Sequence, residues 1–115
     1  MQDSKIFQEL EQRILQYAQD RDWQQFHTPK NMALSLSLEA NEVLELFQWS
    51  VDNNVMLDRA EQLSNELADV FYWLIKLSHF YKIDLADALR EKMSANEAKY
   101  PIQTARSNSA RYNEL

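Results

Sequence analysis

Acidic side chains recur every three residues in two separate stretches of the sequence. Glu39, Glu42 and Glu45 form the first stretch, and Glu66 and Asp69 form the second. On an α-helix, residues three apart lie on the same face, so each stretch would present its acids as one stripe. Facing carboxylates buried between two helices would be costly if uncompensated, and a hard divalent cation with oxygen ligands is the usual compensation. The spacing therefore indicates a metal site.

The alternative interpretation is a solvated acidic surface. Most charged residues are exposed, and like charges at this spacing on a surface cost only a few tenths of a kcal/mol. However, the paired acids have no Lys or Arg three or four places away on their helix, whereas Glu9 has Arg13. We therefore favour a Mg²⁺ site, for which Mn²⁺ is an alternative occupant. Its predicted ligands are Glu39, Glu42, Glu66 and Asp69.

Composition removes several other kinds of chemistry. The 115-residue chain has no cysteine, which excludes disulfides, thiolate metal sites and cysteine nucleophiles. It also has no glycine, which excludes the glycine-rich loops that hold phosphate through backbone N–H groups. The net charge of −6 argues against non-specific nucleic-acid binding. Any phosphate would have to be held by metal ions and side chains.

The elements that must position these acids are predicted to be helices. Tight hairpins are disfavoured because their turns use residues with positive φ, and the apolar residues follow a helical period. Start signals include Thr28 before Pro29, and Asp58 three places before Glu61. The expected helices cover residues 4–20, 28–50, 58–81 and 84–100. The two acidic helices should pack antiparallel in a four-helix bundle, which makes the fold all-α.

One domain is the natural size for this chain. We place the helical domain at residues 1–101 and a tail at 102–115, which has no clear period and is expected to be extended or mobile. No apolar run approaches the roughly 20 residues needed to span a bilayer. The N-terminus also lacks the layout of a signal peptide. We therefore expect a cytoplasmic protein that contacts neither membrane nor nucleic acid.

The acid pairs, Glu-x-x-Glu and then Glu-x-x-Asp on the next helix, resemble the signature of the MazG-like all-α nucleoside triphosphate pyrophosphohydrolases. The likeness runs from residue 21 to the C-terminus and is greatest to the dCTP pyrophosphatase branch. The segments that carry it are RDWQQFHTPKN, ELFQW, ELADVFYWL, KIDLADALREKM and KYP.

This resemblance implies Mg²⁺-dependent hydrolysis of a dNTP, with a dCTP-like preference, to the monophosphate and pyrophosphate in a nucleotide-pool house-cleaning role. It makes Glu39 and Glu42 catalytic as metal ligands. Glu45, one turn further on, either orients the attacking water or is an exposed helix acid. Family members form dimers or dimers of dimers with sites completed between subunits. We therefore expect a homo-oligomer in which the tail packs on a neighbour.

The resemblance also places Trp23, Phe26 and His27 over the nucleobase. Stacking of a base on an aromatic face is worth about 1–3 kcal/mol, and His27 could donate or accept a hydrogen bond at a base edge. Ordinary core packing is the alternative for Trp23 and Phe26. His27 has polar neighbours in a loop, which favours the site.

Two tryptophans on the acidic stripes, Trp49 and Trp73, are expected to close the pocket around base and sugar, with core packing as the alternative. Trp73 stands where this branch has a tyrosine, and Tyr72 directly precedes it. Three further residues are expected to contact the nucleotide, chiefly its phosphates, and they are Lys76, Asn96 and Lys99.

Two other classes of protein remain open at this point. A di-iron carboxylate bundle also uses facing acids but adds Glu-x-x-His, and neither His27 nor His79 follows a Glu by three. A non-enzymatic helical nucleotide-binding or regulatory module would leave the acids in solvent. Replacing Glu42 with Gln distinguishes the helical module from the enzyme. The change would be nearly neutral in the module and would abolish turnover in the enzyme.

Overall fold

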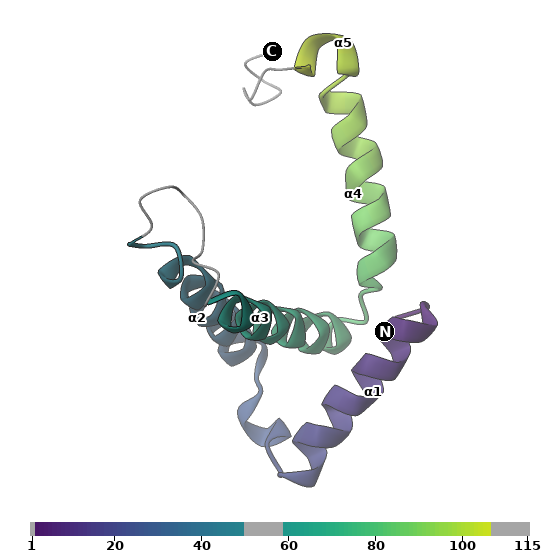
Figure 1. The fold of residues 1–115 in the computed structure, drawn as a ribbon. Coiled ribbons are helices and arrows are strands. Elements are labelled where there is room, and N and C mark those ends of the chain that lie inside the picture. The colour runs from purple at the N-terminus through teal and green to yellow at the C-terminus, as the bar shows by residue number, and fades with distance from the viewer. Residues whose placement is uncertain (1, 50–58, 107–115) are drawn as a thin grey trace.

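The computed structural model describes residues 2–49 and 59–106, and within these ranges every regular element is a helix (Figure 1). The all-α fold predicted from the sequence is therefore confirmed. A single 3₁₀ turn, η1, separates the first two helices. The elements in chain order are α1 (Lys5–Asp20), η1 (Gln24–Phe26), α2 (Pro29–Glu45), α3 (Ala60–Phe80), α4 (Leu85–Lys99) and α5 (Ile102–Ala105).

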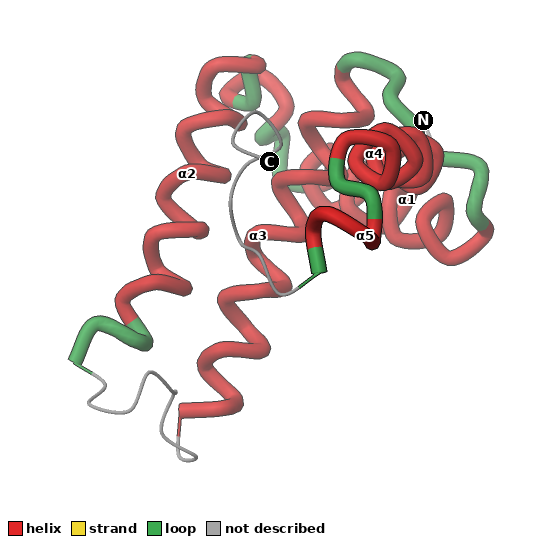
Figure 2. The backbone as a smooth tube through the Cα atoms, turned by 90° about the horizontal axis from the view of Figure 1, so that it is seen from above, coloured by secondary structure: helices red, strands yellow, loops and turns green. Residues whose placement is uncertain are grey.

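The centre of the molecule is an antiparallel hairpin of α2 and α3, which lie side by side along most of their length (Figure 2). Helix α1 packs on α3, and Ala18, Met32 and Ile75 are almost completely buried. Helix α4 extends away from the hairpin and makes only marginal contact with the other helices (Figure 1). One chain therefore holds the acidic helices together, while α4 presents its side chains outward.

Several helix ends follow the predicted capping signals. The Thr28 side chain accepts a hydrogen bond of 3.3 Å from the backbone N–H of Asn31 at the start of α2. The Asp84 side chain accepts one of 3.1 Å from Asp87 at the start of α4. These bonds satisfy backbone donors that have no partner within the helix.

The C-terminal ends of α1 and α3 close in the same way, although the chain has no glycine. Asp22 and Lys82 take the left-handed conformation, with φ of 55° and 58°. The next residue then donates its N–H back to a carbonyl five places earlier, as Trp23 does to Ala18 at 2.9 Å. Glycine normally fills this position, and non-glycine residues occupy it at some steric cost.

The end of α2 differs from the prediction that this helix continues to about residue 50. The helix ends at Glu45, because the following N–H groups switch to carbonyls only three residues earlier. Phe47 donates to Leu44 at 3.0 Å, for example. This tighter winding takes Trp49 off the acidic stripe, and its side chain is 81% exposed.

Two other predicted boundaries also need comment. Helix α3 begins at Ala60, and the expected capping residue, Asp58, lies outside the described residues. The start of the tail is helical over Ile102–Ala105, which corrects the prediction of an extended segment there, because the Pro101 carbonyl accepts hydrogen bonds from Thr104 and Ala105. The remainder of the tail, residues 107–115, is not described.

The N-terminal end is fastened to the turn between α3 and α4 by Gln2, which is 1% exposed. Its side-chain amide donates to the Ser78 hydroxyl at 2.9 Å and to the Ile83 carbonyl at 3.0 Å. Its side-chain carbonyl accepts from the Leu85 N–H at 2.8 Å. Across the part of the chain that the structure describes, no helix is long and apolar enough to cross a membrane.

Candidate metal centre and adjoining aromatic cavity

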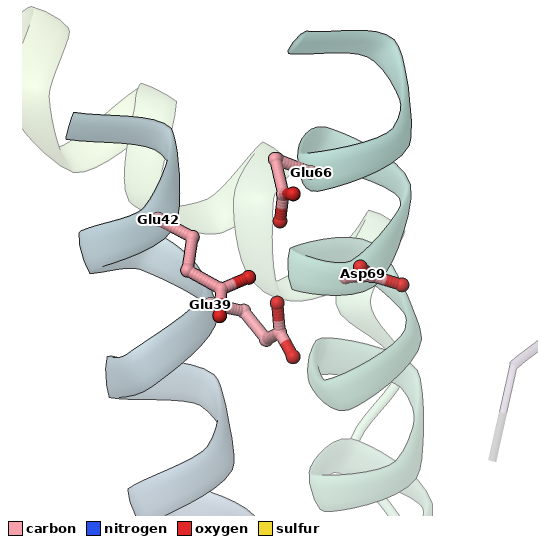
Figure 3. Close-up of side chains that lie close together, drawn as sticks. All are labelled: Glu39, Glu42, Glu66 and Asp69. Atoms are coloured by element: carbon pink, nitrogen blue, oxygen red, sulfur yellow. The ribbon is translucent and has the colours of Figure 1, made fainter. Parts of the chain in front are cut away.

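Four carboxylates meet between the two helices of the hairpin. Glu39 and Glu42 reach from α2 toward the acids of α3 (Figure 3). One oxygen from each of the four side chains lies within 4.8 Å of the others. The residues brought together are the four predicted metal ligands, Glu39, Glu42, Glu66 and Asp69.

The helical spacing explains why these side chains converge. Each pair is separated by three residues on its own helix, which keeps both members on one face. The antiparallel packing of α2 on α3 then sets one face against the other. The juxtaposition therefore follows from the spacing of the acids together with the α2–α3 contact.

The electrostatics of this cluster are those of a site short of positive charge. Burial raises the pKa of the Glu39 carboxyl to about 7, and the hydrogen bond and negative charge of Glu42 add to the rise. The pKa of Glu66 is also raised, chiefly by the neighbouring side chain of Glu42 and then by burial. Glu39 Oε2 and Glu66 Oε2 are buried, and neither has a hydrogen-bond partner among residues 2–49 and 59–106.

Oxygens in that state match a hard divalent cation. Mg²⁺ binds through carboxylate oxygens and has no need of the nitrogen or sulfur ligands that other metals prefer. A cation between the four acids would supply both the missing partner for the buried oxygens and the missing positive charge. The donor set therefore fits Mg²⁺ or Mn²⁺.

Glu45 lies one turn beyond this cluster and is exposed. Its carboxylate accepts a hydrogen bond of 3.2 Å from the Asn41 side chain, and its negative charge contributes to the raised pKa of Glu66. It is therefore near the four acids without being one of them, and its part in catalysis stays a prediction.

An open cavity of about 440 Å³ adjoins the acids, because Glu39 and Asp69 form part of its wall. The rest of the wall is largely aromatic. Its lining also includes Arg13, Ile14 and Tyr17 from α1, Trp23 and His27 from the α1–α2 connection, and Tyr72 and Trp73 from α3. The cavity is therefore acidic at one end and aromatic elsewhere.

The aromatic side chains of the cavity hold one another edge to face. The His27 ring centroid lies 5.2 Å from that of Trp73, and Trp73 lies 4.9 Å from Tyr72. Tyr17 packs against Trp23 at 5.6 Å. Edge-to-face pairs of this kind are favourable beyond the area they bury. The rings of the cavity wall therefore support one another within a single chain.

Lys76 lines a second cavity of about 360 Å³, which shares His27 with the first. Its side chain is 5% exposed, and burial lowers the pKa of its ammonium group. Burial also lowers the pKa of His27, and the charge of Lys76 lowers it further. Lys76 therefore lies at the aromatic end of the site, two helical turns from Asp69.

Four other residues that were predicted to contact the nucleotide do not lie at the acidic cluster within a single chain. Phe26 is 60% exposed in η1, and Trp49 is exposed beyond the end of α2. Asn96 and Lys99 lie on α4, which projects away from the α2–α3 hairpin (Figure 1). A nucleotide contact at these positions stays a prediction.

Four residues of the aromatic cavity were not identified as site residues from the sequence. Arg13, Ile14 and Tyr17 come from α1, where Ile14 and Tyr17 have the spacing of an apolar helix face. Tyr72 was noted only as the neighbour of Trp73. One local signal was available, since Arg21 follows Tyr17 by four residues and stacks its guanidinium 3.9 Å from the Tyr17 ring centroid. That spacing marks an ordered, exposed aromatic ring.

The fold and site define an all-α protein in which two pairs of acids face each other across a helical hairpin. Residues 34–115 match the model of the MazG-like family. The chain belongs to that family.

Individual relatives extend this comparison. The chain is 41% identical over 106 residues to dCTP pyrophosphatase 1 of Homo sapiens and 37% identical over 106 residues to that of Mus musculus. Each match covers 87% of this chain and 62% of the relative, so the chain spans less than two thirds of the length of these relatives. The crystal structure of a pyrophosphatase from Archaeoglobus fulgidus has the same fold, with a TM-score of 0.79 and 36% identity over 88% of this chain and 97% of that one.

Proposed function

We propose that the protein is a Mg²⁺-dependent nucleoside triphosphate pyrophosphohydrolase that converts dNTPs, dCTP among them, to the monophosphate and pyrophosphate. The observation that carries this proposal is the convergence of four carboxylates within 4.8 Å beside an aromatic cavity. A triphosphate needs positive charge at one end, and its base needs a flat apolar surface at the other. The name of the curated relatives, dCTP pyrophosphatase 1, supports the same substrate class.

The four carboxylates are the residues that would hold Mg²⁺, as the buried unpartnered oxygens and raised pKa values of Glu39 and Glu66 support. When bound, the ion would neutralise charge on the triphosphate and make a nearby water more acidic. Glu45 is exposed one turn away, where its carboxylate can accept a proton from the attacking water. We assign it that role of general base.

The aromatic cavity would bind the nucleoside. Trp23, His27 and Trp73 supply ring faces and edges around a space of about 440 Å³, which is within the usual size of small-molecule sites. Trp73 follows Asp69 by four residues, so the base and the metal would be held about 6 Å apart along the axis of α3. That offset would leave room for the sugar between them.

A homodimer or homotetramer would complete the site. Asn96 and Lys99 lie on a helix that reaches outward from its own hairpin, where a second chain could meet it. Apolar side chains along α3 and α4 form a further open groove of about 750 Å³ that includes Phe71, Leu89 and Met93. In this assembled form, Asn96 and Lys99 would contact the phosphates. Trp49 would contact the base. House-cleaning of the nucleotide pool in the cytoplasm is the corresponding role.

The test is the release of pyrophosphate from a panel of dNTPs with Mg²⁺, comparing the wild type with Glu42→Gln. The variant keeps the size of the side chain but removes one carboxylate from the cluster, so turnover should fall by at least a hundredfold while the helical circular dichroism is unchanged. Glu61→Gln, an exposed acid in the first turn of α3, is the matched control and should keep full activity. Equal activity in Glu42→Gln and wild type, or activity that survives EDTA, would contradict the proposal.

A non-enzymatic helical module is the second candidate. Its support is limited to the exposure of Glu42 and Asp69. It predicts that no nucleotide in the panel is hydrolysed and that Glu42→Gln leaves nucleotide binding unchanged.

A further inference from the structure

A buried lysine without a counter-charge lies beyond the aromatic end of the site. Lys76 is 5% exposed. Within residues 2–49 and 59–106 it has neither a carboxylate partner nor a hydrogen-bond acceptor, and its one aromatic contact is the Tyr72 ring, whose centroid lies 6.0 Å from Nζ. Lysine is seldom buried unless it is paired. The ammonium group is therefore placed to donate to an acceptor that a ligand would bring.

The position of Lys76 relative to the acids identifies which part of a ligand it would meet. Asp69, Trp73 and Lys76 share one side of α3, and Lys76 is about 10 Å beyond Asp69 along the helix axis. His27 lines both the aromatic cavity and the cavity that contains Lys76. Tyr72, next to Nζ, also lines the aromatic cavity. A nucleotide with its phosphates at the acids would thus point the end of its base toward Lys76.

The chemistry of that end of the base differs among nucleotides. The sugar is attached at N1 of a pyrimidine, so the exocyclic group on C4 is at the opposite end of the ring. Thymine and uracil carry a carbonyl oxygen there, which accepts hydrogen bonds, and cytosine carries an amino group, which donates them. Guanine and adenine differ in the same way at C6. A lysine ammonium group has three donors and no acceptor, so at this exocyclic position it can pair with the carbonyl and not with the amino group.

We propose that Lys76 is a specificity-determining residue that donates to the exocyclic carbonyl of the base and so favours keto bases over amino bases. This inference rests on the proposed function, since it assumes a nucleotide in the aromatic cavity. It names the substrate class further: dUTP, dTTP and dGTP are favoured by this residue over dCTP and dATP. The chain would then hydrolyse dUTP as well as the dCTP of its relatives' names.

The experiment compares dUTP with dCTP, which share the sugar and triphosphate and whose bases differ at C4, the group that Lys76 would meet, and at the adjacent N3. Lys76→Met keeps the length of the side chain and removes the charge and the donors. The ratio of kcat/KM for dUTP to that for dCTP should fall by about tenfold or more, because hydrogen bonds to charged groups are the stronger kind. Lys76→Gln, which offers both donors and an acceptor, should bring the ratio close to one. The control is Lys30→Met, an exposed lysine at the start of α2, and it should leave the ratio unchanged.

A ratio is insensitive to the fraction of folded enzyme, so a purely structural role for Lys76 would not move it. An unchanged ratio in both Lys76 variants of an active enzyme would overturn the inference and leave the proposed function intact. If the wild type hydrolyses neither nucleotide, the proposed function fails, and tryptophan fluorescence then measures the binding of dUMP against dCMP. Tighter binding of dUMP that is lost in Lys76→Met would still support the inference, and equal binding would overturn it.

Discussion

Replacing Glu39 with Gln should stabilise the metal-free protein at pH 8 while removing its response to Mg²⁺. Glu39 has a pKa of about 7 in the folded chain, against 4.5 for an ordinary Glu, because it is buried beside three other acids. The folded state therefore binds this proton more tightly than the unfolded state. The corresponding stability is fully present below pH 4.5 and is lost as the pH rises through 7.

The size of the effect follows from that shift. One pKa unit corresponds to about 1.4 kcal/mol, so the full shift corresponds to about 3 kcal/mol. Solvent screens a carboxylate that is partly exposed, which reduces the expected gain for Glu39→Gln at pH 8 to about 1–2 kcal/mol. For a domain of this size the melting temperature should rise by about 4–8 °C.

Thermal unfolding followed by circular dichroism, in EDTA at pH 5 and pH 8, measures this directly. The variant should be more stable than the wild type at pH 8 and no more stable at pH 5. Saturating Mg²⁺ at pH 8 should raise the melting temperature of the wild type and leave that of the variant nearly unchanged. Glu9→Gln, an exposed acid on α1, should behave as the wild type does. A variant that is less stable than the wild type in EDTA at pH 8 would refute this reasoning.

Three further changes probe the rest of the molecule. Gln2→Ala removes three hydrogen bonds that fasten the N-terminal end and should lower the free energy of unfolding by about 2 kcal/mol in urea titrations; no change would mean that the fastening is dispensable. Asp84→Ala should lower the melting temperature at pH 7, because hydrogen bonds from Asp87 and Asp3 lower the pKa of this carboxylate. The stabilisation is present above pH 3.8 and is lost in acid. The melting temperatures of the variant and the wild type should therefore become equal at pH 2. Trp73→Ala should raise KM for dCTP by about tenfold or more, through the loss of base stacking, and an unchanged KM would place the base elsewhere.

Local signals in the sequence were sufficient for the helices and for the acidic cluster. Thr28 and Asp84 mark helix starts through hydrogen bonds that involve only their own next few residues. The spacing of Glu39 with Glu42, and of Glu66 with Asp69, fixes a common face on each helix. One further assumption, that consecutive helices pack antiparallel, was enough to bring the four together.

Features that depend on contacts between distant segments could not be read from local pattern. Tyr17 has the spacing of a core residue on α1, and only the packing of α1 on α3 makes it a wall of the aromatic cavity. Lys76 was predicted from the sequence to contact the nucleotide, but its burial depends on the neighbouring segments. The early end of α2 depends on whether each N–H donates to the carbonyl three or four residues earlier, and these two bonds differ little in energy. The change to the tighter winding also moves Trp49 off its predicted stripe.

The most direct test of the central claim, that the four acids hold a metal ion for pyrophosphate release, is phosphorus NMR of dCTP incubated with the protein and Mg²⁺. The account predicts dCMP and pyrophosphate as the only products, and unchanged dCTP when Glu42→Gln replaces the wild type. Formation of dCDP and orthophosphate, or unchanged dCTP with the folded wild type, would contradict it.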